Sequence, residues 1–68
     1  MPKLNWTDAD EIGFQLHEAH PDLDPLSVSF TALRDLVTSL DEFAGDPTAT
    51  SEPVLEAIQM AWLEYFNE

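Results

Sequence analysis

The sequence contains no cysteine, and only two of its 68 residues, Lys3 and Arg34, are basic. The absence of cysteine excludes a disulfide framework, a thiolate metal site, a cysteine nucleophile and a metal cluster held by this chain's own thiolates. Two cations against 14 acidic residues give a net charge of −12. Because such a surface repels phosphate backbones and anionic lipid headgroups, neither nucleic acid nor a membrane is expected as a partner.

Long hydrophobic runs are also missing. No apolar stretch approaches the length of a membrane span, and no basic region precedes an apolar one, so we expect a cytoplasmic protein. The hydrophobic fraction is nevertheless 44%, and two Trp, four Phe and one Tyr are spread along the chain, which favours a folded state over disorder. We expect one domain, 1–68, with a small core, and a monomer because no large exposed apolar face is evident.

Two acidic turns that contain proline divide the chain into three predicted helices, which indicates an all-α fold, a small three-helix bundle. The first helix is predicted at residues 8–19, with Thr7 as its N-cap and Pro21 just beyond its end. Its inward stripe comprises Ala9, Ile12, Leu16 and Ala19. Gly13 costs roughly 1 kcal/mol relative to alanine in mid-helix, so another segment is expected to approach closely there.

The second helix is predicted at residues 32–43 with Thr31 as its N-cap, and the third begins after Ser51. The inward positions of these two helices are Leu33, Leu36, Val37, Leu40, Leu55, Ile58, Trp62 and Tyr65. Because the third helix is apolar around much of its circumference, we expect it to be the central one. Residues 4–6 and 28–30 alternate briefly and are predicted to pair as a minimal two-strand ribbon.

Three short motifs resemble functional sites but lack the spacing that those sites need. His17 and His20 are three residues apart, whereas a zinc-protease helix needs two histidines four apart. Asp22 and Asp24 begin like a calcium loop, but no third ligand or glycine follows at the required places. Ser39 keeps an acyl-carrier-like domain as an alternative, although a carrier serine belongs at a helix start. No nucleophile and base are suitably spaced, so catalysis is not expected.

The remaining candidates are carboxylates. Asp8, Glu11 and Glu18 share one face of the first predicted helix, and Asp22 and Asp24 follow directly in the turn. Hard oxygen ligands bind divalent or trivalent metal ions, weakly where no cage is preformed. The same face would also dock on an arginine-rich protein surface with electrostatically steered association. Composition alone does not choose between a metal and a protein as the target.

A series of short motifs runs through nearly the whole chain without a gap. They are Leu4-x-Trp6-Thr7-Asp8, Glu11-Ile12-Gly13, Pro21-Asp22-Leu23-Asp24-Pro25, Val28-x-Phe30-Thr31, Leu40-x-x-Phe43, Asp46-Pro47, Ser51-Glu52, Leu55-Glu56-Ala57-Ile58 and Trp62-Leu63. In this order, and at this length and charge, the set resembles the IscX family of bacterial iron–sulfur cluster assembly proteins, also called YfhJ. Each motif is weak alone, and the combination is specific.

The resemblance implies a small helical fold related to winged helices, and a role as an adaptor or regulator of cluster assembly rather than an enzyme. It implies binding to the pyridoxal-phosphate cysteine desulfurase IscS, at a basic patch near the active site that bacterial frataxin also uses. It further implies weak binding of Fe2+ or Fe3+, with no tightly held cofactor. A dedicated iron-binding or iron-delivery protein is the alternative function.

The resemblance and the charge pattern also indicate which residues act. The expected partner-binding residues are Asp8, Glu11, Glu18, Asp22, Asp24, Asp41 and Glu42. Of these, Glu18, Asp41 and Glu42 are included by charge alone. The expected iron ligands are Asp8, Glu11, Asp22 and Asp24.

Overall fold

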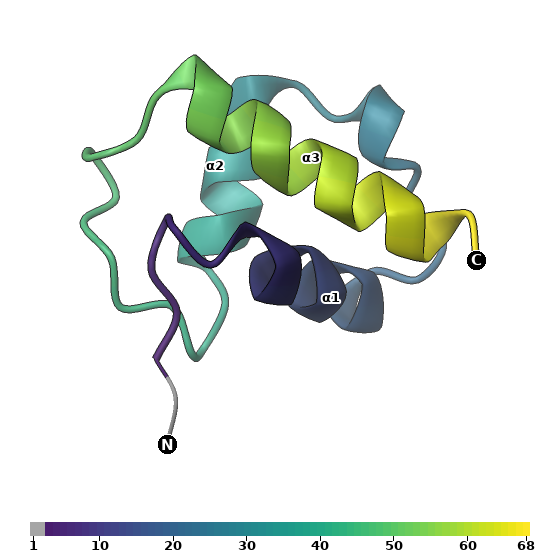
Figure 1. The fold of residues 1–68 in the computed structure, drawn as a ribbon, viewed down its shortest axis with the longest axis horizontal. Helices are drawn as coiled ribbons and strands as arrows, with labels where there is room; N and C mark the ends of the chain where they lie inside the picture. The colour runs from purple at the N-terminus through teal and green to yellow at the C-terminus, as the bar shows by residue number, and fades with distance from the viewer. Residues whose placement is uncertain (1–2) are drawn as a thin grey trace.

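The computed structural model describes residues 3–68, which fold into three α-helices and one short 3₁₀ helix (Figure 1). In chain order these are α1 (Ala9–Ala19), η1 (Pro25–Ser27), α2 (Phe30–Thr38) and α3 (Glu52–Phe66). The most extensive contact between elements is that of α1 with α3, and α2 and η1 also pack against α3. The predicted all-α, three-helix fold is therefore confirmed, and so is the central position of the third helix.

The core draws its side chains from all three α-helices and from the segment before α1. Its buried members are Leu4, Trp6, Ile12, Leu16, Leu33, Val37, Leu55, Ile58 and Trp62. Burying one large apolar side chain stabilises the folded state by about 1.5–3 kcal/mol, so these side chains dominate the fold's stability. Tyr65 is only half-buried, and Ala19 is exposed although its spacing predicted an inward position. Ala19 is exposed because α1 ends there, beside an open cleft.

Gly13 lies at a close approach of α1 to α3. A Cβ atom at this position would lie 2.7 Å from the backbone nitrogen of Trp62 and 2.9 Å from the carbonyl carbon of Ala61. Such distances are far below van der Waals contact, so only glycine allows the two helix backbones to come this near. The close approach expected from a glycine in mid-helix is confirmed.

The first predicted N-cap is wrong by one residue. α1 begins at Ala9, and its N-cap is Asp8 rather than Thr7. The Asp8 carboxylate does not cap the amides of α1. It accepts a hydrogen bond of 2.9 Å from the backbone N–H of Asn5, and the Asp8 N–H donates to the Asn5 carbonyl at 2.9 Å. This closed turn at residues 5–8 sets the start of the helix.

The second predicted helix is displaced toward the N-terminus. α2 runs from Phe30 to Thr38 instead of 32–43, and its N-cap is Ser29 rather than Thr31, because the extended Ser29 accepts a hydrogen bond from the Ala32 N–H at 3.2 Å. The helix ends early because the next residues close tighter turns, beginning with the Leu40 N–H that donates to Val37. The third helix is correct in position, with Ser51 at its N-cap.

The predicted ribbon between residues 4–6 and 28–30 is wrong. Leu4 instead forms a single parallel bridge with Phe43, in which the Leu4 N–H donates to Glu42 at 2.7 Å. The Ala44 N–H in turn donates a hydrogen bond of 2.8 Å to the Leu4 carbonyl. Phe43 leaves the helical path because its ring packs edge-on against Trp6, with ring centroids 4.7 Å apart. The N-terminal segment thus fastens the chain that follows α2.

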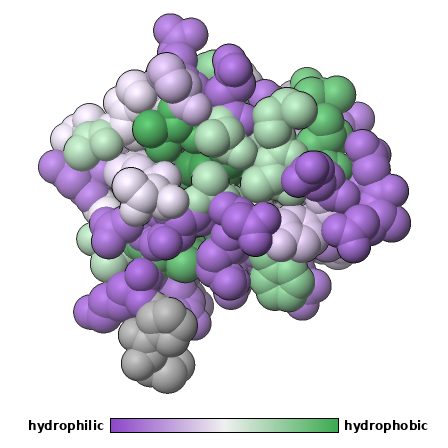
Figure 2. Space-filling model, in the orientation of Figure 1, coloured by the Kyte–Doolittle hydropathy of each residue, from purple (hydrophilic) through white to green (hydrophobic). Residues whose placement is uncertain are grey.

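Most of the surface is hydrophilic, although Figure 2 shows apolar side chains gathered across the middle of one face, where α3 crosses it in Figure 1. The large apolar side chains with most exposure are Leu26 at 63%, Met60 at 52% and Phe14 at 39%. The edge of Phe14 is partly covered by Tyr65, whose ring centroid lies 5.5 Å away. Within residues 3–68 no helix has the length and hydrophobicity that crossing a membrane would require.

Candidate acidic docking surface

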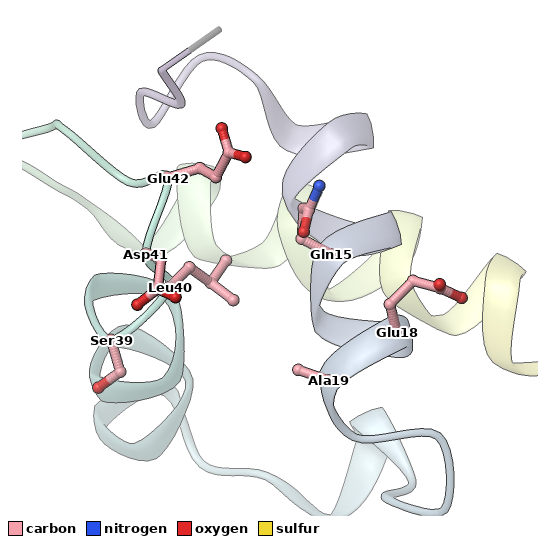
Figure 3. Close-up of a pocket in the computed structure, with 7 residues that line it drawn as sticks. All are labelled: Gln15, Glu18, Ala19, Ser39, Leu40, Asp41 and Glu42. Atoms are coloured by element: carbon pink, nitrogen blue, oxygen red, sulfur yellow. The ribbon is translucent and has the colours of Figure 1, made fainter. Parts of the chain in front are cut away.

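A cleft separates α1 from the turns that follow α2. It has a volume of about 430 Å³ and is lined by Gln15, Glu18, Ala19, Ser39, Leu40, Asp41 and Glu42 (Figure 3). Three of the expected partner-binding residues, Glu18, Asp41 and Glu42, therefore lie around one concavity although they come from separate parts of the sequence. Among the described residues, none that lines the cleft is basic, so no positive side chain in the lining balances these carboxylates.

The early end of α2 builds the wall of the cleft opposite α1. Leu40, half-buried, extends toward α1 and supplies an apolar floor together with the methyl group of Ala19, which points back across the gap (Figure 3). Had α2 continued to residue 43 as predicted, this stretch would have been helical and its side chains would have taken other directions. The change of direction after Thr38 therefore creates the concavity.

The three carboxylates occupy different parts of the rim. Glu42 extends toward α1, Asp41 stays beside Ser39, and Glu18 projects from α1 away from the opposite wall (Figure 3). Glu42 is half-buried, and Glu18 and Asp41 are exposed. The backbone of Glu42 is fixed by the hydrogen bond that its carbonyl accepts from Leu4. One side of the rim is thus held in place while its carboxylates remain available to solvent.

Comparison with known proteins identifies the kind of protein to which this surface belongs. A model of the family described as "Iron-sulphur cluster assembly" matches residues 4–67, nearly the whole chain. The chain belongs to this iron–sulfur cluster assembly family. It is also 52% identical over 61 residues to a Pseudomonas aeruginosa protein named "Uncharacterized protein PA3808". The aligned residues cover 90% of this chain and 92% of that protein. The resemblance to the IscX family is confirmed, since IscX belongs to the matched family.

In this member of the family, the other four expected residues lie outside the cleft, and all are exposed. Asp8 closes the turn before α1, as described above. Glu11 accepts a hydrogen bond of 3.3 Å from the side-chain N–H of Gln15, one helical turn away. The Asp24 carboxylate accepts a hydrogen bond of 2.9 Å from the Leu26 N–H and so caps η1. Asp8 and Asp24 therefore have structural roles in addition to any role in binding.

The expected metal ligands are spread over α1 and the turns beside it. Across residues 3–68 no three His, Asp or Glu side chains lie close enough together to hold a metal ion. Ser39, the candidate carrier serine, is the C-cap of α2 and lies at the end of that helix rather than at its start.

Two titratable groups outside the cleft are perturbed by hydrogen bonds. The Tyr65 hydroxyl donates to the Asp10 carboxylate at 3.1 Å, and this bond raises the pKa of Tyr65 because ionisation would place a phenolate beside a carboxylate. The Asp46 carboxylate accepts from the backbone N–H of Thr48 at 2.9 Å and from its hydroxyl at 2.8 Å, which lowers the pKa of Asp46.

A second cleft, of about 300 Å³, lies between α2 and the start of α3. Its lining residues are Phe30, Thr31, Arg34, Thr50, Ser51, Glu52 and Leu55. Arg34 is the one basic residue after Lys3 in the sequence, so the second cleft combines opposite charges and differs in character from the first.

Sequence reasoning missed Gln15, Ala19, Ser39 and Leu40 as lining residues of the acidic cleft. Gln15 is four residues after Glu11 and three before Glu18, a spacing that places it on their helix face, and this was the one available signal. Leu40 was instead assigned to the core of a longer helix. Locating the cleft required knowing that α2 ends at Thr38.

Proposed function

We propose that this protein is an adaptor or regulator of iron–sulfur cluster assembly that binds the cysteine desulfurase IscS through its acidic surface. The acidic surface comprises Asp8, Glu11, Glu18, Asp22, Asp24, Asp41 and Glu42, all of them exposed except the half-buried Glu42. Membership of the assembly family, combined with the gathering of three of these carboxylates around one cleft, is the observation that carries the proposal.

The charge of the protein explains how recognition would operate. A net charge of −12 on 68 residues produces a strong field that accelerates encounter with a basic surface and disfavours acidic partners. Rim charges of this kind act mainly on the association rate and on the salt dependence of affinity. From the resemblance to IscX we expect the basic target to lie near the desulfurase active site, where bacterial frataxin also binds, so the two proteins should compete.

The proposal is tested by calorimetric titration of the protein into the cognate desulfurase, at ~20 mM and ~150 mM salt. We expect saturable binding that weakens at the higher salt. Charge reversal at the exposed positions Glu18 and Asp22 should weaken it several-fold, whereas Glu56→Lys on α3 makes the same charge change outside the acidic surface. Asp24 is left intact because it caps η1.

Unchanged affinity in both salt conditions would refute this mode of binding. An equal loss for Glu18→Lys and Glu56→Lys would show that net charge matters and that the acidic surface does not. Addition of frataxin provides a further check, because a ternary complex with undiminished affinity would contradict competition for one basic patch.

We propose weak iron binding by the exposed carboxylates as a second property of the same surface. Oxygen ligands suit Fe2+ and Fe3+, and with few protein ligands to each ion the rest of the coordination shell would be water. Anaerobic titration with Fe2+ in the absence of desulfurase should show saturation at a defined stoichiometry, reduced by neutralising Glu11 and Asp22. A smooth titration without saturation would indicate counter-ion accumulation instead and would also exclude a dedicated delivery role.

A further inference from the structure

We propose that the cleft between α1 and residues 39–42 receives an arginine side chain of the partner protein. The inference rests on the proposed function, because it names the group of the basic partner that enters this part of the acidic surface. Its basis is the shape of the cleft, the acceptors on its rim and the apolar surface at its floor.

The cleft is an open concavity, whose floor a side chain that projects from the partner can reach. A volume of about 430 Å³ lies within the range of about 300–1,000 Å³ that is usual for ligand sites. At the floor, Leu40 and Ala19 offer carbon atoms to an incoming stem or planar group (Figure 3). A cation that enters here must therefore also carry apolar surface.

The acceptors on the rim come from both walls. Glu42 extends toward α1, and the amide of Gln15 lies on the α1 side (Figure 3). The Gln15 N–H donates to Glu11 at 3.3 Å, which leaves the amide oxygen as an acceptor for a ligand. Asp41 and Glu18 add negative charge farther out on the rim. None of the described lining residues supplies a positive charge, so an entering cation would be attracted to the rim carboxylates with no positive side chain of the lining to repel it.

This arrangement suits a guanidinium group better than a metal ion or an ammonium group. Within residues 3–68 no three carboxylate or imidazole side chains lie close enough together to hold a metal ion, so the cleft offers no preformed cage to a point charge. A guanidinium presents five donors in a planar fork and can bond to both walls at once. It is also more weakly hydrated than an ammonium, so its flat face can lie on Leu40.

The wall that carries Glu42 is positioned before binding. Leu4 bonds to the backbone on both sides of Phe43, and the Phe43 ring is packed against Trp6. Little ordering of the main chain then accompanies binding, which favours affinity for a single side chain.

The first test titrates the full-length, nitrogen-15-labelled protein with the capped tripeptide acetyl-Gly-Arg-Gly-amide, followed by nuclear magnetic resonance. The matched probe contains lysine in place of arginine. We expect saturable shifts confined to the amides of residues 15–19 and 39–44, in the millimolar range, with arginine several-fold tighter than lysine. Equal affinity for both peptides, or shifts spread over all acidic segments, would overturn the proposal.

Two variants extend the test. Glu42→Gln removes the negative charge and one of the two acceptor oxygens on the fixed wall, and Ala19→Met fills the cleft without changing charge, at an exposed helical position. Both should reduce arginine binding several-fold, whereas Glu56→Gln and Ala57→Met make the same changes at exposed positions of α3 and should not. Spectra of each free variant establish that it is folded. Unchanged arginine binding by Ala19→Met would overturn the proposal.

Titration of the same variants into the desulfurase separates the two proposals. If the natural protein binds and Ala19→Met and Glu42→Gln bind equally well, the arginine site is wrong and the proposed function stands. If the arginine peptide saturates the cleft but the desulfurase does not bind at either salt concentration, the site stands and the proposed partner is wrong. A several-fold loss confined to the cleft variants supports both.

Discussion

Replacement of Gly13 by alanine probes the close approach of α1 to α3. In an unconstrained helix this substitution would stabilise the protein by about 1 kcal/mol, because alanine is the better helix former. Here the added Cβ would lie 2.7 Å from Trp62 N and 2.9 Å from Ala61 C. Both atoms belong to the backbone of α3, so no rotation of a side chain relieves the overlap. The two helices must separate or α3 must distort.

The expected net effect follows from these opposing contributions. Overpacking of a well-packed interior typically costs about 1–3 kcal/mol, and the overlap here is with rigid groups, which places it in the upper part of that range. After subtraction of the gain in helix propensity, we expect destabilisation of about 1–2 kcal/mol. For a chain of this size that corresponds to a fall in Tm of about 5–15 °C.

Urea and thermal unfolding, followed by circular dichroism at 222 nm, measure this change. Gly45→Ala is the comparison variant, because the three atoms nearest to its added Cβ all belong to side chains, those of Phe43 and Asn5, rather than to the backbone. The double variant Gly13→Ala with Ala61→Gly removes the one side-chain contact, of 3.0 Å, and leaves both backbone contacts. It should therefore recover little stability. An increase in stability for Gly13→Ala, or full rescue by Ala61→Gly, would refute the packing argument.

Three further predictions concern single hydrogen bonds. Ser29→Ala removes the N-cap of α2 and should cost about 1 kcal/mol in urea unfolding, an unchanged midpoint being contrary to the assigned cap. Trp6→Phe removes the hydrogen bond of 2.6 Å that the indole N–H donates to the carbonyl of Asp46, and should lower the free energy of unfolding by at least about 1 kcal/mol. If this contact forms late in folding, the substitution raises the unfolding rate and leaves the folding rate unchanged. The hydrogen bond to Asp10 raises the pKa of the Tyr65 hydroxyl. The stability that this bond contributes is therefore present below the unfolded-state pKa of about 10 and is lost as pH rises through the folded-state pKa. Absorbance at 295 nm follows this one tyrosine, and Asp10→Asn should shift its titration to lower pH; an identical curve would contradict the bond.

The positions of the helices could be predicted from the sequence because the apolar spacing that creates their buried faces is local. Ile12 and Leu16 predicted the buried face of α1, and Ile58 and Trp62 that of α3. Gly13 even indicated the close approach of another segment. Each of these inferences depends on residues within one or two helical turns.

The boundaries of α2 could not be predicted in this way. Ser29 and Thr31 are both suitable caps by residue type, and the choice between them depends on backbone conformation. The C-terminal end is decided by distant residues, because Phe43 packs on Trp6 and bridges to Leu4. Local periodicity carries no information about these distant contacts, which compete with continuation of the helix, so the prediction extended the helix too far.

For the candidate site, the sequence established the chemical type of the surface and its exposure. A preponderance of carboxylates cannot be buried without partners, so the expected residues had to lie at the surface. Their grouping could not be predicted from the sequence, because Glu18 and Glu42 line the same cleft only after α1 packs beside the turns that follow α2. The role of Leu40 in the floor was hidden for the same reason.

The placement of Arg34 within α2 makes proteolysis unusually simple to interpret. Trypsin cleaves after lysine and arginine, and the chain offers only Lys3, near its N-terminus, and Arg34. A bond inside a helix is protected until the helix opens, so the rate at which the chain is cut into two large pieces reports every opening of α2, whether local or with the whole fold. Mass spectrometry of the digest would thus follow exposure of one bond, because α1 and α3 contain no tryptic site. Slower cutting in the presence of a ligand would show how strongly that ligand stabilises α2.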